Sequence, residues 1–221
     1  RQPEGNTKNA PKDSPMPSII PALTTSQIAG LDTATIAALT TADWAAFSSS
    51  QIAALGTEQV VAISTQGMAA ISTSGMRGWE TAELEGLSSA QLRAITTTGL
   101  ALTTTQVRSL GTDDIVALGS TDLAAMSTQQ VAAMATAQVA ALTTEQIANL
   151  TTAQVAGLGT AQVVALGTSQ VQALETSQVA ALTTSQVRAM ETADVAAIET
   201  TDLAAMGTAQ LRAMSTAQFN A

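Results

Sequence analysis

Large apolar residues recur along this chain with a period of eight, which matches neither an ideal helix nor a strand. Taking Leu23 as position 1 gives LTTSQIAG, LDTATIAA, LTTADWAA and so on to MSTAQFNA, which ends at Ala221. Positions 1 and 6 are always apolar, and position 8 is nearly always Ala or Gly. Only residues 95–101 form a seven-residue unit, so residues 23–221 contain 25 repeats. Such repetition predicts a solenoid, in which each unit buries its apolar side against its neighbours.

The polar positions favour one short helix in each repeat. Position 3 is Thr or Ser in every unit, and a hydroxyl there can accept an unpaired N–H of the first helical turn. We therefore predict helix caps at position 3, with Thr25, Thr152, Thr160 and Thr168 as examples. The residues that follow are good helix formers, and Asp at position 5 in five units suits the positive end of a helix. A continuous helix is excluded because eight residues fit neither 3.5 nor 3.6 residues per turn.

A β-solenoid is the alternative, because Thr and Val are common in strands. Its turns would carry Gly, Asn or Asp, whereas this repeat has Ala at those positions. The predicted fold is therefore all-α, a solenoid of very short stacked helices with one helix per repeat. Positions 1, 6 and 8 are expected to face inward. Position 7, which holds every Arg of the repeats, is expected to face water.

Residues 1–22 differ sharply from the repeats, because all five prolines lie within the first 21 residues. Proline removes a backbone donor and disfavours a helix, so we expect an extended or polyproline-type N-terminal arm. Ile19 and Ile20 are its apolar pair, flanked by prolines. They are suited to contact with a neighbouring subunit, and a disordered leader or linker is the alternative.

Composition argues against several classes of function. The net charge of −9 with only 11% charged residues argues against nucleic acid as a partner. Without His or Cys there is no Ser–His or Cys–His pair, so we expect no enzyme, cofactor or metal site. Asp113–Asp114 and the group Glu80, Glu83 and Glu85 are expected to be solvated surface, not a cation site. No apolar run approaches the roughly 18 residues of a membrane span.

The run LTTAQVAG, LGTAQVVA, LGTSQVQA, LETSQVAA, LTTSQVRA, residues 150–189, resembles the Ala/Thr/Gln octapeptide arrays of large proteobacterial surface and secreted proteins. The resemblance covers residues 23–221 and implies a repeat architecture in an extracellular, secreted or cell-surface setting. Arrays of this kind are associated with haem utilisation or adhesion. The haem association finds no support in the residues, because only Met is present as a potential axial ligand and the repeat methionines are at core positions 1 and 6.

The first and last repeats both follow the consensus, so both ends of the solenoid are expected to lack polar caps. We predict a structural subunit of an extracellular filament that binds itself head to tail, with the arm contacting a neighbour. The expected interface residues are Ile19, Ile20, Pro21, Leu23, Ile28, Met214 and Phe219. The alternative is a segment of a repeat adhesin or of a glycan- or ice-binding array with host-surface partners. In that case the position 2 hydroxyls, such as Thr143 and Thr151, would be the ligand candidates.

Overall fold

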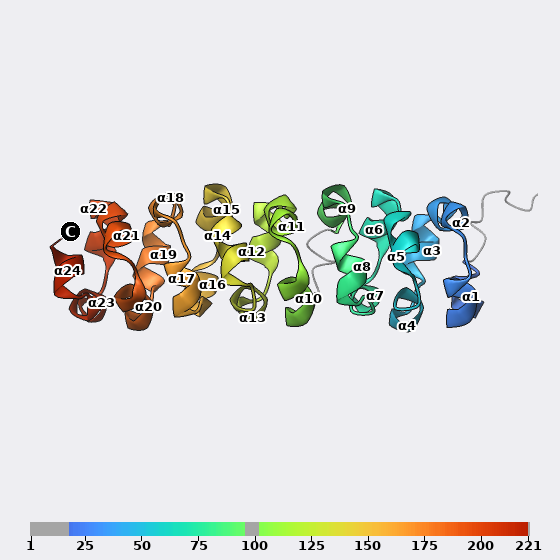
Figure 1. Ribbon diagram of the computed structural model, residues 1–221, viewed down its shortest axis with the longest axis horizontal. Coiled ribbons are helices and arrows are strands. Elements are labelled where there is room, and N and C mark those ends of the chain that lie inside the picture. Colours follow the sequence, from blue (N-terminus) through green and yellow to red (C-terminus); the bar gives the residue numbers. More distant parts are fainter. Residues whose placement is uncertain (1–17, 96–101, 221) are drawn as a thin grey trace, which may run out of the picture.

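The computed structural model describes residues 18–95 and 102–220 and shows an elongated, all-helical rod (Figure 1). No strand occurs in these ranges. The prediction of a helical solenoid with one helix per repeat is confirmed for this part of the chain. Residues 1–17 of the expected arm, most of the seven-residue unit at 95–101 and Ala221 lie outside the described residues.

One 3-10 helix, η1 (Ile20–Ala22), precedes the α-helices. The α-helices are α1 (Thr25–Ala29), α2 (Thr33–Ala38), α3 (Thr41–Ala45), α4 (Ser49–Ile52), α5 (Thr57–Val61), α6 (Thr65–Ala70), α7 (Thr73–Met76), α8 (Thr81–Glu85), α9 (Ser89–Ala94), α10 (Thr104–Ser109), α11 (Thr112–Ala117), α12 (Ser120–Ala125), α13 (Thr128–Ala132), α14 (Thr136–Ala141), α15 (Thr144–Asn149), α16 (Thr152–Gly157), α17 (Thr160–Val164), α18 (Thr168–Gln172), α19 (Thr176–Ala181), α20 (Thr184–Ala189), α21 (Thr192–Ala197), α22 (Thr200–Ala205), α23 (Thr208–Ala213) and α24 (Thr216–Phe219).

Three repeats make one turn of the solenoid. Each helix packs against the helix three repeats further along, as α3 does with α6 and α19 with α22. Across residues 96–101 the contacts join α8 to α10 and α9 to α11. The seven-residue unit counts as one repeat between the partners of each pair, although none of the numbered helices lies in it. Helices on the two sides of this unit are therefore also stacked three repeats apart. One turn of full repeats therefore spans 24 residues.

Positions 1 and 6 form one continuous apolar core that runs from Ile20 to Met206. Position 7 faces water as predicted, and its valines at 61, 116 and 164 are among the few exposed large apolar residues. Position 8 is only half-buried in many repeats, so its assignment to the core was only partly right. Position 5 is buried in most repeats, although its Gln is polar. This was not predicted.

Position 8 is small because position 3 of the preceding turn lies against it. A Cβ added to Gly157 would lie 3.7 Å from the Thr128 Cβ and would clash with the Thr128 Cγ2. Gly86 stands in the same relation to Thr57, whose Cγ2 would be 3.0 Å from an added Cβ. The invariant residue at position 3 therefore packs between turns.

The prediction that the caps lie at position 3 was wrong. The N-cap is position 2, as at Thr24, Thr151, Gly159 and Gly167, and position 3 is already the first helical residue. The Thr151 hydroxyl accepts the Gln154 N–H at 3.1 Å. Thr25, Thr152, Thr160 and Thr168 therefore do not cap their helices. The exposed position 2 hydroxyls, considered above as ligand candidates, are structural caps in many repeats.

The expectation of a non-helical arm was wrong at its last residues, where η1 forms. Pro21 lies in the first turn of η1, where its fixed φ is compatible with a helix and no N–H is needed. The Ser18 hydroxyl accepts the Ile20 N–H at 3.2 Å. Ile20 is fully buried and takes position 6 of an incomplete repeat ahead of Leu23.

The adjacent threonines of α16 test the corrected cap. We expect Thr151→Ala to lower the free energy of unfolding by about 1 kcal/mol, because the Gln154 N–H loses its hydroxyl acceptor. Thr152→Ala leaves the cap intact and should cost less. Denaturant unfolding of both variants measures the difference. Because Thr152 also packs between turns, amide hydrogen exchange at Gln154 reports on the cap itself, and faster exchange in Thr152→Ala than in Thr151→Ala would contradict the assignment of the cap to position 2.

Candidate functional site

Each Gln at position 5 completes the N-terminus of its own helix. Its Oε1 accepts the backbone N–H of the N-cap residue at 2.7–2.9 Å in all fifteen cases, whatever residue stands at the N-cap. Where the N-cap is Ser or Thr, its hydroxyl accepts the Gln N–H in return, which makes a reciprocal capping box. Gly, Ala and Glu are therefore tolerated at position 2, because the Gln Oε1 still accepts the N–H of the N-cap residue when that residue has no capping hydroxyl.

The same Gln side chain binds the preceding turn through its Nε2. Gln154, which is 1% exposed, donates to the carbonyls of Leu123 at 2.9 Å and Met126 at 2.7 Å. These acceptors lie at position 6 and position 1 of the turn below. The position 6 carbonyl also accepts a backbone N–H, from Met126 to Leu123 at 3.1 Å. Every Gln at position 5 except Gln27 makes such an inter-turn bond, and we call each one a rung.

Three consecutive repeats have no rung, because Gly67, Gly75 and Glu83 replace the Gln. Aromatic side chains lie around this gap. A Cβ on Gly67 would be 2.6 Å from the Trp44 Nε1, so the indole fills the space that the Gln side chain would need. Trp44 also stacks on Phe47, with ring centroids 4.8 Å apart and planes inclined by 16°. The indole N–H groups of Trp44 and Trp79 are buried without a hydrogen-bond partner.

An Asp at position 5 also cannot form a rung, because a carboxylate has no N–H to donate. Asp194 and Asp202 instead accept hydrogen bonds from the Thr168 and Thr176 hydroxyls of the turn below, at 3.1 and 2.6 Å. Asp114 accepts the Gly111 N–H at 3.0 Å. Burial raises the pKa of Asp114 above the ordinary value of 3.8, and the charge of Asp113 adds to the effect. Burial also raises the pKa of Asp122.

The N-terminal end of the rod presents position 5 side chains. Gln27 and Thr35 are exposed there, because no turn lies beneath them among the described residues. Asp43 is half-buried and accepts from the Thr40 N–H at 2.9 Å and from the Thr40 hydroxyl at 2.6 Å. Hydrogen bonds from Thr40 and Ser18 hold the pKa of Asp43 below its ordinary value. Among the described residues, the Gln27 Nε2 at this end makes no inter-turn hydrogen bond.

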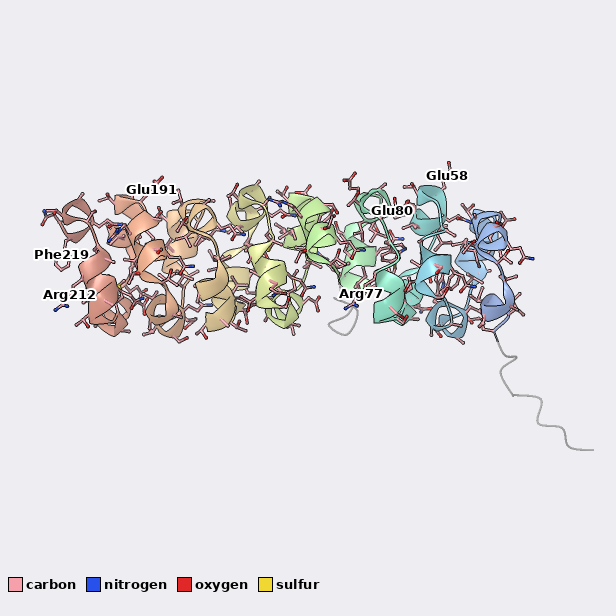
Figure 2. The ribbon with its side chains drawn as sticks, turned by 90° about the horizontal axis from the view of Figure 1, so that it is seen from below. Glu58, Arg77, Glu80, Glu191, Arg212 and Phe219 are labelled. Carbon is pink, nitrogen blue, oxygen red and sulfur yellow. The ribbon has the colours of Figure 1, made fainter. Side chains whose placement is uncertain are left out.

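The C-terminal end presents position 6 side chains. Val179 and Val187 are fully buried inside the rod, whereas Phe219 is 65% exposed. Figure 2 shows Phe219 and Arg212 at this end. A groove of about 370 Å³ opens here. It is lined mainly by apolar side chains, including Val195, Ile198, Leu203, Leu211, Met214 and Phe219. The carbonyls at positions 1 and 6 of this turn receive no rung from the described residues.

The predicted interface residues do not form one patch. Ile20 and Ile28 are fully buried in the chain's own core, so their assignment to a free surface was wrong. The physical reason is that Ile20 occupies a repeat position of its own and Ile28 is covered by the second turn. The others are half-buried or exposed, with Ile19, Pro21 and Leu23 at one end of the rod and Met214 and Phe219 at the other.

The acidic side chains of the described residues do not gather in groups of three that would suit a metal ion. Glu80, Glu83 and Glu85 lie at the start of and within α8, and Glu80 and Glu85 are exposed. Glu145, Glu175 and Glu199 line an open, polar groove of about 460 Å³ on the side of the rod. None of the described helices has the length and apolar character needed to cross a membrane.

The rungs predict that glutamines at the same repeat position contribute very differently to the free energy of unfolding. Gln154→Leu leaves the buried Met126 carbonyl and the Thr151 N–H without these partners, so we expect a loss of roughly 2–3 kcal/mol in unfolding free energy. Gln27→Leu removes only the local cap, and its cost should be below about 1 kcal/mol. Denaturant unfolding with amide hydrogen exchange measures both. Similar losses at the two positions would contradict the inter-turn role.

Asp114→Gln should restore a rung and remove a pH dependence. Because the folded pKa of Asp114 is raised, its contribution to stability falls as the pH rises above 3.8. The Gln side chain would donate to the carbonyls of Leu84 and Leu87 by the rule of the other repeats. We expect a gain of about 1 kcal/mol at pH 7 that is smaller at pH 3. Asp113→Asn, at the exposed neighbour, is the control, and a destabilised Asp114→Gln at pH 7 would refute the prediction.

Comparison with known families places these observations in a wider group. The ALTTAQ repeat model matches residues 36–73, 115–152, 149–176, 155–192, 171–198 and 195–221, together more than half of the chain. The unmatched interior, residues 74–114, includes Gly75, Glu83 and the seven-residue unit, where the repeat departs furthest from its consensus. No curated protein matches the chain. The repeat character inferred from the sequence is confirmed, and the chain belongs to the ALTTAQ repeat family.

Proposed function

We propose that this chain is a structural subunit of an extracellular bacterial filament that assembles head to tail through the two ends of the rod. The observation that carries the proposal is that the last and first described turns match: the last forms an apolar groove beside Phe219, which is 65% exposed, and the first presents the exposed Gln27 side chain. An exposed apolar groove that is normally covered by the next turn favours an occupant of the same construction.

The first turn of a second copy has the side chains that this face requires. If it continued the eight-residue register, Gln27 of the second copy would lie opposite the carbonyls of Val195 and Ile198. That is the relation of Gln218 to Val187 and Met190, at 2.9 and 2.8 Å, within the chain. The second copy would also cover Leu203, Leu211 and Phe219. The joint would repeat the interior packing and needs no new kind of contact.

The extracellular and bacterial setting of the proposal rests on the resemblance to Ala/Thr/Gln arrays of proteobacterial surface and secreted proteins. The proposal assigns a mechanical role to the chain and no catalytic one. A rod whose hydrogen bonds run between turns along its axis is suited to such a role.

A second candidate is a segment of a longer repeat adhesin or of a glycan- or ice-binding array. The exposed hydroxyls of positions 2 and 3 along the rod, such as Thr143, Thr144 and Thr152, favour it. In that case the C-terminal face would be covered by further repeats of the same chain. Mass spectrometry of the native protein separates the two, since a mass well above 22.3 kDa supports the longer array. Glycan-array and thermal-hysteresis measurements test its ligands.

A pair of engineered cysteines tests the joint directly, because the chain has no Cys. Positions 3 and 8 of successive turns approach closely, with 3.7 Å between the Thr128 Cβ and a Cβ built on Gly157. This distance suits a disulfide. The equivalent pair across the joint is Thr200 of one copy and Gly30 of the next. Under oxidation, a chain with both Thr200→Cys and Gly30→Cys should form a ladder of covalent multimers on a non-reducing gel.

Control variants distinguish crosslinking across the joint from other disulfide formation. Each single Cys variant should stop at the dimer, and Thr128→Cys with Gly157→Cys should oxidise within one chain. Phe219→Asp should abolish the covalent multimers, whereas Val164→Asp, on the side of the rod, should leave them intact. A double variant that stays monomeric at high concentration while the internal control oxidises fully would refute the filament.

A further inference from the structure

Residues 18–22 occupy the place of a repeat. Counting back from Leu23, Ile20 takes position 6 and Ala22 takes position 8 of an incomplete unit. The rung rule holds for it, since the Gln51 Nε2 donates to the Ile20 carbonyl at 2.7 Å and to the Leu23 carbonyl at 2.9 Å. This unit therefore lies three repeats before α3 and underlies that helix, whereas α1 and α2 have no turn beneath them among the described residues. The Ser18 hydroxyl also bonds to Asp43 at the base of α3.

Head-to-tail stacking in the interior register requires this same place. The first repeat of a second copy would follow α24 of the first copy. Hence α24 would occupy the position directly ahead of the second copy's α1, which that copy's own residues 18–22 now fill. Phe219 is the position 6 residue of α24 and Ile20 is the position 6 residue of the incomplete unit. The two side chains compete for one site, and only one of them is buried in the isolated chain.

The incomplete unit is built more weakly than α24. Its position 5 is Ile19, which is 69% exposed and has no amide group with which to cap a helix or form a rung. α24 has a complete capping box, in which the Ser215 N–H donates to the Gln218 Oε1 at 2.8 Å. It also has rungs to the turn below. An exchange would replace a single 3-10 turn by a full helical repeat.

We propose that residues 18–22 are a displaceable cap, which fills the joint site in the free chain and is exchanged for α24 of a second copy during stacking. This inference rests on the proposed function and adds a control step to it. In the free chain the cap covers the N-terminal side of α3, whereas Gln27 of α1 and Thr35 of α2 stay exposed. Assembly then begins when the cap leaves its site.

Adjacent isoleucines provide a matched test in the full-length chain. Ile20→Asp removes the buried anchor of the cap, and Ile19→Asp changes its exposed neighbour. By sedimentation velocity over a concentration series, we expect Ile20→Asp to stack at a concentration at least tenfold lower than the unmodified chain. Ile19→Asp should leave that concentration unchanged. Ile20→Ala, a milder loss of the anchor, should shift it in the same direction, and circular dichroism checks that each variant stays helical.

Phe219 distinguishes exchange from nonspecific association. In the Ile20→Asp background, Phe219→Asp should abolish stacking, whereas Val164→Asp should not. The proposal is overturned if both Ile20 variants stack no more readily than the unmodified chain, and the filament itself still stands if that chain stacks. It is also overturned if the Ile20 variants associate independently of Phe219. If no variant stacks at any concentration, the filament and the cap fall together.

Discussion

The rod depends on one side chain, the glutamine at position 5, which bonds to two helices at once. A helix of five or six residues has almost no internal hydrogen bonds, because its first N–H and last C=O groups lack partners. Such a helix does not persist alone in water. In this chain the Gln Oε1 satisfies an N–H at the start of its own helix, and the Nε2 satisfies carbonyls at the end of another helix 28 and 31 residues earlier. A Glu side chain could replace the Gln Oε1 as acceptor, but it has no N–H groups to replace the Nε2 as donor, and it would bury a charge. Local helix formation and turn-to-turn cohesion are therefore the same interaction.

Cohesion along the rod is uneven as a result. Rungs are unbroken from Gln130 to Gln186, and they are absent from the three consecutive repeats with Gly67, Gly75 and Glu83. One other inter-turn hydrogen bond crosses the gap, from the Ser49 hydroxyl of α4 to the Ser74 carbonyl of α7. Aromatic volume from Trp44 and Phe47 takes the space instead, so directional bonds are exchanged there for apolar contact. Two buried indole N–H groups without partners show that this packing has an energetic cost. The turn at residues 63–86 is thus held to its predecessor mainly by side-chain burial.

The sequence predicted the features that depend on local spacing. The period, the apolar columns at positions 1 and 6 and the single short helix per repeat all follow from residues within eight of one another. The cap was misplaced by one residue because positions 2 and 3 both carry hydroxyls. The stricter position, Thr152 in its repeat, is strict for another reason, which is contact with a residue 29 positions further on. The partners of Gln154 and the three repeats per turn also depend on long-range geometry that no local pattern contains. Ile20 was hidden by the prolines around it, although its spacing of eight from Ile28 was a usable signal.

The rungs also make the two ends of the rod chemically different, and this difference limits how two copies can bind each other. Position 5 side chains point toward the N-terminal end and position 6 side chains toward the C-terminal end, as Gln27 and Phe219 show where the stack stops. Two C-terminal faces brought together would bury apolar side chains, but Gln218, which lines this face, already donates to the carbonyls of Val187 and Met190 and is not available to the carbonyls of Ile198 and Met206 of the other copy. Two N-terminal faces would oppose polar side chains with no acceptors aligned to them. A two-fold dimer through either end therefore leaves polar groups buried and unpaired. Only a heterologous contact brings donors onto acceptors, and such a contact repeats without closing unless the rods curve into a ring.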